Sequence, residues 1–203
     1  YRKVGQIANS RNIVGVQAAQ AILQAAGLYG VNIQEIGGDL TDHYDPRSKT
    51  LRFSQRVGRG NSVASMAIVA HEIGHAQQDH TGYLLLRLRG GIVPLVNIGS
   101  QLGPILFFIG MLLNFPTLTW IGIIFFSGAF VFALITLPVE LNASSRAMKM
   151  LKTSNLLVDQ REMGGARAVL TAAALTYVAG MLTAFFQLLY YISLASGRSN
   201  RRN

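Results

Sequence analysis

The stretch His71-Glu72-Ile73-Gly74-His75 predicts a helix that presents two imidazole rings on one face. Residues four positions apart on a helix point the same way, so His71 and His75 can hold one Zn²⁺ ion through their ring nitrogens. Glu72 would then lie beside the open coordination position, where its carboxylate can accept the proton of a water that the metal activates. The pattern is therefore typical of a site that hydrolyses peptide bonds.

The residues around this motif favour a buried helix. Asn61 or Ser62 can cap its start, and a run of small and apolar residues follows. Between Arg59 and Asp79 the only charged residue is Glu72. Buried polar groups are costly without partners, and a metal ion would serve as a partner for all three side chains. A core helix with two hydrogen-bonded histidines is the alternative.

Two long stretches, 90–139 and 168–197, contain no charged residue and no histidine. Asn114-Phe115-Pro116-Thr117 divides the first stretch into two segments, each close to the ~20 residues that cross a bilayer. The last segment is longer and could cross with a tilt. A buried soluble hairpin is the alternative, but soluble helices seldom run so far without a charged face. We therefore expect three membrane spans, at about 92–113, 118–139 and 169–194.

The composition limits the chemistry of the site and its partners. The chain has no cysteine, so metal ligands must be histidines and carboxylates. Its net charge is +9, but the basic residues cluster beside the apolar segments and form no stripe with interleaved aromatic residues, which argues against nucleic-acid binding. The chain begins with Tyr1-Arg2-Lys3, and a further membrane anchor could precede it.

The expected fold class is α+β, mainly α, with a small zincin-like extramembrane domain, a short sheet and about three transmembrane helices. A helix over 16–26 and strands at 31–36 and 49–54 precede the motif helix. By analogy with zincins, a sheet edge beside that helix could accept a peptide as an added strand; a structural hairpin is the alternative. The expected divisions are a metallopeptidase domain at 1–89, a transmembrane hairpin at 90–139, a helical segment on the same side as the motif at 140–167, a third span at 168–197 and a basic tail at 198–203.

A catalytic zinc usually has three protein ligands, and the residue pattern leaves the third one open. The candidates are His80, Glu140, Asp79, Asp42, Asp45 and His43. His80 lies five residues after His75, which places it ~140° away from the ligand face of the helix. Glu140 follows fifty residues without a charge, and two spans return it to the side of the motif. An interfacial carboxylate without a ligand role is the alternative for Glu140.

Four motifs occur in order along the chain: Leu40-Thr41-Asp42-His43-Tyr44-Asp45-Pro46, His71-Glu72-Ile73-Gly74-His75-Ala76, Leu137-Pro138-Val139-Glu140-Leu141-Asn142-Ala143-Ser144 and Ala172-Ala173-Ala174-Leu175-Thr176-Tyr177-Val178. Together they resemble the YugP-like family of bacterial membrane zinc metallopeptidases over about residues 10–194. The resemblance implies a membrane-embedded, gluzincin-type neutral metallopeptidase with Glu140 as the third zinc ligand. The family often has Asp where this chain has Asn142, which would orient a ligand histidine less strongly if that position contacts one.

His43 is a further candidate for the catalytic machinery. Zinc proteases usually place a His, Tyr or Arg donor beside the metal to stabilise the oxyanion of the transition state. His43 and Tyr44 lie between Asp42 and Asp45, on the loop before the strand nearest the motif. The Asp-His-Tyr-Asp-Pro stretch is typical of a turn, and the alternative is that His43 contacts the transition state or the substrate as a catalytic residue.

The sequence thus predicts a membrane-embedded zinc endopeptidase that acts on peptide bonds of membrane-associated or misfolded proteins. A membrane scaffold or complex subunit with a vestigial or structural zinc site is the alternative, although such a site needs no general base. A transporter is disfavoured because the spans contain no charge. Basic residues beside the spans predict a multi-pass cell-membrane protein whose site faces the cytoplasm. The tail residues Arg198, Arg201 and Arg202 would then lie outside, against this rule.

Overall fold

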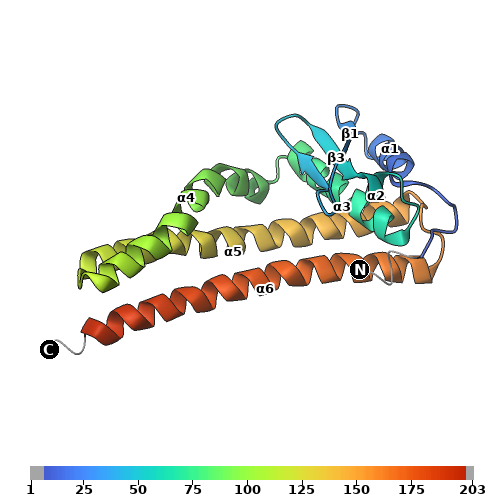
Figure 1. Ribbon diagram of the computed structural model, residues 1–203. Coiled ribbons are helices and arrows are strands. Elements are labelled where there is room, and N and C mark those ends of the chain that lie inside the picture. Colours follow the sequence, from blue (N-terminus) through green and yellow to red (C-terminus); the bar gives the residue numbers. More distant parts are fainter. Residues whose placement is uncertain (1–6, 200–203) are drawn as a thin grey trace. The chain divides into compact units, whose positions relative to one another are not determined.

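The computed structural model describes residues 7–199, of which most are helical (Figure 1). Helices make up 72% of the described residues, and a single three-stranded sheet accompanies them in the same part of the chain. The expected class, α+β and mainly α, is confirmed. The first residues, Tyr1-Arg2-Lys3, and the tail residues Arg201 and Arg202 lie outside the described residues, as does the side chain of Arg198.

The chain divides into two compact units, and the first of them contains the motif helix. This unit comprises residues 1–83 and 139–175. Helix α3, Val63–His80, begins after Ser62, whose hydroxyl oxygen accepts a hydrogen bond from the backbone N–H of Ser65 at 3.0 Å. Such a cap satisfies one of the free donors in the first helical turn. The small and apolar residues of α3 are buried almost all round, as their lack of charge predicts.

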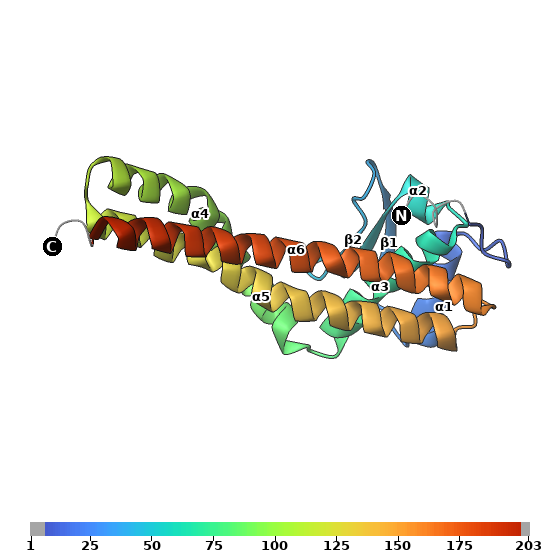
Figure 2. The same cartoon turned by 90° about the horizontal axis from the view of Figure 1, so that it is seen from below.

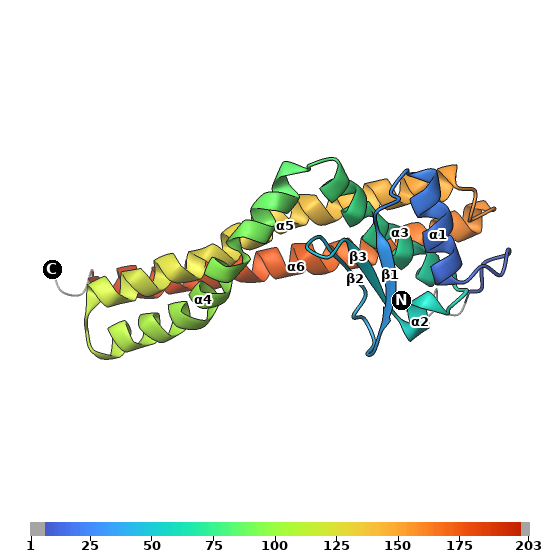
Figure 3. The same cartoon turned by 90° about the horizontal axis from the view of Figure 1, so that it is seen from above.

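The sheet of this unit has the strand order β1-β3-β2 (Figure 3). The two expected strands form as β1, Asn32–Ile36, and β3, Thr50–Ser54, but they pair in parallel and do not make a hairpin. The hairpin partner of β3 is a short strand that the sequence pattern did not predict, β2, His43–Asp45. Because β2 has a neighbour on one side only, it is an edge strand.

Two further helices and parts of two longer ones complete the core of the first unit. Helix α1, Gly15–Ala25, ends where Gly27 adopts a left-handed backbone with φ +69°, as expected for a glycine just past a helix end. The short helix α2, Gln55–Gly58, links β3 to α3. The end of α5, Pro116–Thr153, and the start of α6, Gln160–Ser199, run side by side (Figures 1 and 2) and contribute buried residues to the same core as α3.

The region 140–167, predicted as a helical segment, comprises the end of α5, a short connection and the start of α6. Residues 140–153 continue α5 without a break, and α6 begins at Gln160 after a short connection. Asn155 in that connection has a positive φ of 53°. An apolar-to-polar change in the sequence marks a change of surroundings, and a helix can pass through it because its backbone hydrogen bonds are internal. The other expected divisions of the chain stay predictions.

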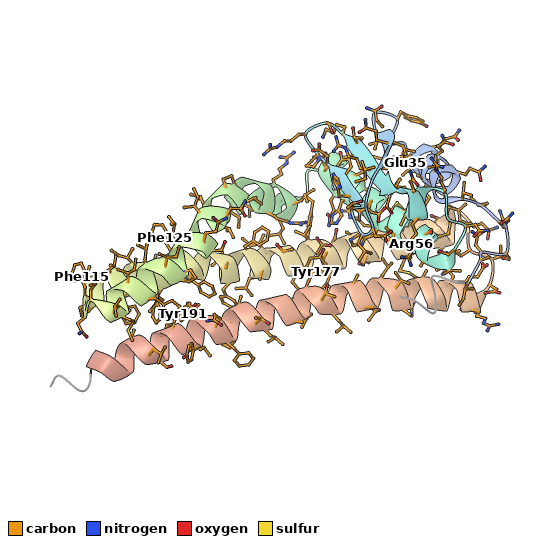
Figure 4. The ribbon with its side chains drawn as sticks, viewed as in Figure 1. Glu35, Arg56, Phe115, Phe125, Tyr177 and Tyr191 are labelled. Atoms are coloured by element: carbon orange, nitrogen blue, oxygen red, sulfur yellow. The ribbon has the colours of Figure 1, made fainter. Side chains whose placement is uncertain are left out.

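The second unit comprises residues 84–138 and 176–203 and contains α4, Leu84–Leu112. Gly103 of α4 lies so close to α5 that a Cβ atom there would be 2.7 Å from the backbone nitrogen of Phe126. Small residues permit such close helix approach. Tyr191, labelled in Figure 4, stacks on Phe107 with ring centroids 4.4 Å apart. The helices α4, α5 and α6 are each long and apolar enough to cross a membrane.

Candidate metal centre

The two motif histidines and Glu140 meet within the first unit. The Nε2 atom of His71 lies 3.1 Å from Oε2 of Glu140, and Nε2 of His75 lies 3.5 Å from the same oxygen. One possible ligand atom from each residue lies within 4.8 Å of the others. Among the described residues this is the group of His, Asp and Glu side chains that could hold a metal ion.

The spacing of residues along α3 and the close approach of α5 place these side chains together. His71 and His75 are one turn apart on α3, so their rings stand next to each other, with centroids 4.8 Å apart and planes at 87°. Helix α5 passes close to α3 at Gly74, where a Cβ atom would lie 2.6 Å from the carbonyl oxygen of Ala143. Only glycine allows this approach, which brings Glu140, one turn before Ala143, to the two rings.

The packing at Gly74 gives a first prediction. Gly74→Val should lower the free energy of unfolding by about 1–3 kcal/mol, because the new side chain forces the backbone of α5 away from α3. Thermal unfolding of the full chain in detergent would measure the loss. Gly164→Val is the matched control, since Gly164 is exposed on a helix and has no neighbour within 4 Å of a Cβ position. Equal stability of the two variants would contradict the close approach.

The donor set fits a zinc ion. Two imidazole nitrogens and one carboxylate oxygen make up a ligand set that catalytic zinc sites use, with one position left for water. Tetrahedral zinc with bonds of the usual length holds neighbouring donor atoms ~3.3 Å apart, and the two distances to Glu140 are 3.1 and 3.5 Å. The side chain of Glu140 is only 2% exposed. A carboxylate so deeply buried requires cationic or hydrogen-bonding partners, which a metal ion and its imidazole ligands can supply.

Glu72 lies beside this group and is held by the sheet. Its Oε2 atom accepts a hydrogen bond from the backbone N–H of Tyr44 at 3.0 Å. Loss of hydration on burial raises the pKa of Glu72 to about 7, and the negative charge of Glu140 adds to this, while His71 and the Tyr44 N–H oppose it. A carboxyl group with a pKa near neutrality can both accept and return a proton, and a bound cation would lower this pKa.

Tyr44 also places the edge strand against the motif helix. Its backbone reaches Glu72, and its phenol donates a hydrogen bond to Asp79, near the end of α3, at 2.7 Å. The strand that borders the site is therefore β2. Sequence reasoning placed these residues on a loop, because a strand of three residues followed by Pro46-Arg47-Ser48 is too short for an alternating pattern to be recognised.

Two polar side chains that the sequence analysis did not single out contact the far side of the imidazole rings. Nδ1 of His71 lies 3.2 Å from Oγ of Ser144, and Nδ1 of His75 lies 3.0 Å from Oε1 of Gln78. The contact of Gln78 with His75 could have been predicted from their spacing, since residues three apart on a helix are neighbours.

Asn142 does not contact a histidine among the hydrogen bonds of this site. Its Oδ1 atom accepts hydrogen bonds from Gln78 at 3.0 Å and from Arg146 at 2.8 Å. The expectation that Asn142 weakens a direct hold on a ligand ring therefore does not apply here, because Gln78 lies between them. An amide oxygen is a suitable acceptor for both of these donors.

The remaining candidates for the third ligand lie outside this group. His80 is exposed at the end of α3, as the helix geometry predicted. The three aspartates have other partners among the described residues: Asp42 accepts from Ser54, Asp45 from Arg52 and Ser48, and Asp79 from Tyr44 and Lys49.

His43 is exposed on β2, where side chains alternate between the two faces. Its Nδ1 atom lies 2.7 Å from the carbonyl oxygen of Thr41, and its Nε2 atom lies 3.5 Å from Arg52. The neighbouring Tyr44 is the residue that points inward. A catalytic role of His43 stays a prediction, and its present contacts are local to the sheet.

Comparison with known proteins gives two matches. A family described as "Putative neutral zinc metallopeptidase" matches residues 1–196. The chain is also 43% identical over 194 residues to the "Putative membrane protease YugP" of Bacillus subtilis (strain 168). The aligned region covers 96% of this chain and 86% of that protein. No solved structure matches the chain.

Proposed function

This chain belongs to the family of putative neutral zinc metallopeptidases, and we propose that it is a membrane-embedded zinc endopeptidase. The observation that carries the proposal is the meeting of His71, His75 and Glu140 with Glu72 beside them. In this proposal the first three residues hold the zinc ion and Glu72 is the general base. A purely structural zinc site would need no such base and usually closes with a fourth protein ligand.

The chain's own residues supply positioning and proton transfer. Zinc, when bound, acts as a Lewis acid that favours attack of water on a peptide carbonyl. Glu72 accepts one proton of that water as the oxygen adds to the carbonyl carbon. It then gives the proton to the nitrogen as the carbon–nitrogen bond breaks, which releases an amine and a carboxylic acid. The N–H of Tyr44 keeps the Glu72 carboxylate in place during both steps.

Strand β2 is the element best placed to bind the substrate. It is an edge strand, and it borders the general base through Tyr44. An extended peptide can add to such an edge through backbone hydrogen bonds, which would bring its scissile bond towards Glu72. The substrate in this proposal is a membrane-associated or misfolded protein, and the partners are that protein and the lipid bilayer. Interaction with further membrane proteins is left open, and no nucleic acid is expected.

The proposed location is the cell membrane, with the site on the cytoplasmic side. Three helices are able to span a bilayer, and basic residues flank the apolar segments on the side that carries the motif. The sequence-based divisions at 1–89, 90–139, 140–167, 168–197 and 198–203 form part of this proposal.

Metal analysis combined with a protease assay tests the proposed function. The purified full chain in detergent should contain about one zinc per chain and should cleave an unfolded protein such as casein. Removal of the metal with a chelator should abolish cleavage, and added Zn²⁺ should restore it. A zinc-loaded protein that cleaves no unfolded or membrane-associated substrate would favour the scaffold alternative. Cleavage that survives complete removal of the metal would exclude the zinc mechanism.

Glu140 should behave as a ligand and not as an interfacial charge. Glu140→Ala is expected to lower zinc affinity and peptidase activity together, because the buried oxygen that faces both imidazoles is removed. Zinc content after dialysis and the cleavage rate would measure both effects. Glu35→Ala is the control, since Glu35 pairs with Arg59 at the surface, where solvent screens an ion pair and its loss has little effect. If the chain keeps its zinc when Glu140 is replaced but loses it when His80 is replaced, the third ligand lies beside the motif.

A further inference from the structure

Gln78 is a fully buried amide at the contact between α3 and α5. Its exposed fraction is 0%. Its Nε2 atom donates to the carbonyl oxygen of Val139 at 2.8 Å and to Oδ1 of Asn142 at 3.0 Å. Its Oε1 atom lies 3.0 Å from Nδ1 of His75. A buried amide with three partners of this kind is rigidly held, and its orientation is determined by what those partners can donate or accept.

The two partners on the nitrogen side of this amide can only accept. The backbone carbonyl of Val139 has no proton to donate. Asn142 directs its oxygen to this place because it also faces Arg146, whose guanidinium has only donors. The side of Gln78 that faces Val139 and Asn142 must therefore be the NH₂ group, and the oxygen must face His75.

This orientation determines where the proton of the His75 ring lies. An amide oxygen can only accept, so Nδ1 of His75 must carry the hydrogen and donate it. In a neutral imidazole the lone pair is then on Nε2, the atom that faces Glu140 at 3.5 Å. The ring is thus prepared to bind a metal through Nε2.

The same amide also holds the third proposed ligand. Val139 directly precedes Glu140 on α5, so one side chain binds His75 on one side and the backbone next to Glu140 on the other. The two proposed ligands are far apart in the sequence, and Gln78 joins the ring of His75 to the backbone carbonyl that precedes Glu140. We propose that Gln78 is the positioning residue of the metal centre, which fixes the tautomer of His75 and the place of Glu140 relative to it. This inference rests on the metal ligands of the proposed function.

A matched pair of variants tests the role of Gln78. Gln78→Met keeps the length and volume of the side chain but removes all three hydrogen bonds, and we expect it to weaken Zn²⁺ binding about 10- to 100-fold, as loss of a partner to a ligand histidine usually does. Gln77→Met is the control, because Gln77 contacts Arg146 and not a ligand histidine, and it should bind Zn²⁺ as the unchanged chain does. The affinity is measured on the full chain in detergent by competition with a chromophoric chelator. Co²⁺ absorption reports the geometry of the site.

The outcome distinguishes this inference from the proposed function. Loss of affinity in Gln78→Met with a changed Co²⁺ spectrum supports the positioning role. Equal affinity in Gln78→Met and the unchanged chain, or equal losses in both variants, overturns it while leaving the zinc site in place. If the unchanged chain binds no Zn²⁺, the proposed function itself is wrong.

A measurement on the unchanged chain covers the case in which Gln78→Met does not fold. Nitrogen NMR of ¹⁵N-histidine-labelled full chain with Zn²⁺ should show His75 with its proton on Nδ1 and Nε2 bound to the metal. His75→Asn identifies the signal. A His75 ring that carries its proton on Nε2 in the zinc-bound chain contradicts the inference, whatever the variant does.

Discussion

Glu72→Gln is expected to keep the metal and the fold and to abolish turnover. The amide has the size of the carboxylate, and its oxygen can still accept the hydrogen bond from Tyr44, but its NH₂ group cannot take a proton from water. The cleavage rate should fall by at least the ~10² to 10⁴ that general acid–base groups contribute. Cleavage of an unfolded protein, metal content and thermal unfolding would be measured on the same preparation.

The control for this substitution is Glu35→Gln, which makes the same replacement of one carboxylate oxygen by NH₂ on an exposed side chain. It should leave the cleavage rate, the zinc content and the thermal unfolding unchanged. Cleavage by Glu72→Gln at a near-normal rate would mean that another group accepts the proton or that a contaminating protease is present. Loss of zinc in Glu72→Gln would mean that Glu72 helps to hold the metal and is not simply the base.

The double variant His71→Ala, His75→Ala should contain no zinc and show no activity. Two of the three proposed ligands disappear, and a single carboxylate cannot hold zinc at the concentrations used for purification. The zinc content should fall from about one per chain to background, as measured by elemental analysis of the purified protein. His43→Ala and His80→Ala are the controls, because both rings are exposed and should leave the zinc content unchanged. Full zinc occupancy in the double variant would refute the ligand assignment.

The motif helix and the apolar segments could be predicted because each carries its signal within a short stretch. The spacing of His71 and His75 and the missing charges around them predict both the helix and its burial, and α3 agrees. Glu140 is different, since no local pattern marks it as a ligand. Two expected spans lie between the motif and Glu140, which returns Glu140 to the side of the motif, and the family resemblance also pointed to it. The close approach of α5 at Gly74 brings it to the histidines.

Other parts of the site depend on contacts that no local pattern contains. Strand β2 is three residues long and exists because β3 offers it a partner. The spacing of Gln78 and His75 could have indicated their contact, but Val139 and Asn142, the partners of the Gln78 NH₂ group, come from a segment more than sixty residues away. The position of Tyr44 next to Glu72 likewise follows from packing of the sheet on α3. These contacts can be recognised only when segments that are separate in the sequence are placed together in the fold.

The separation of the ligands along the chain also has a consequence for biosynthesis. Glu140 follows His71 by 69 residues, and the residues between them include the whole of α4 and the part of α5 that precedes Glu140. A growing chain that has emerged only as far as the histidines lacks the carboxylate, the Val139 carbonyl and Asn142. The proposed centre can therefore form only after both of those apolar segments have been translated, so a nascent chain that ends before Glu140 carries the two histidines without the third proposed ligand.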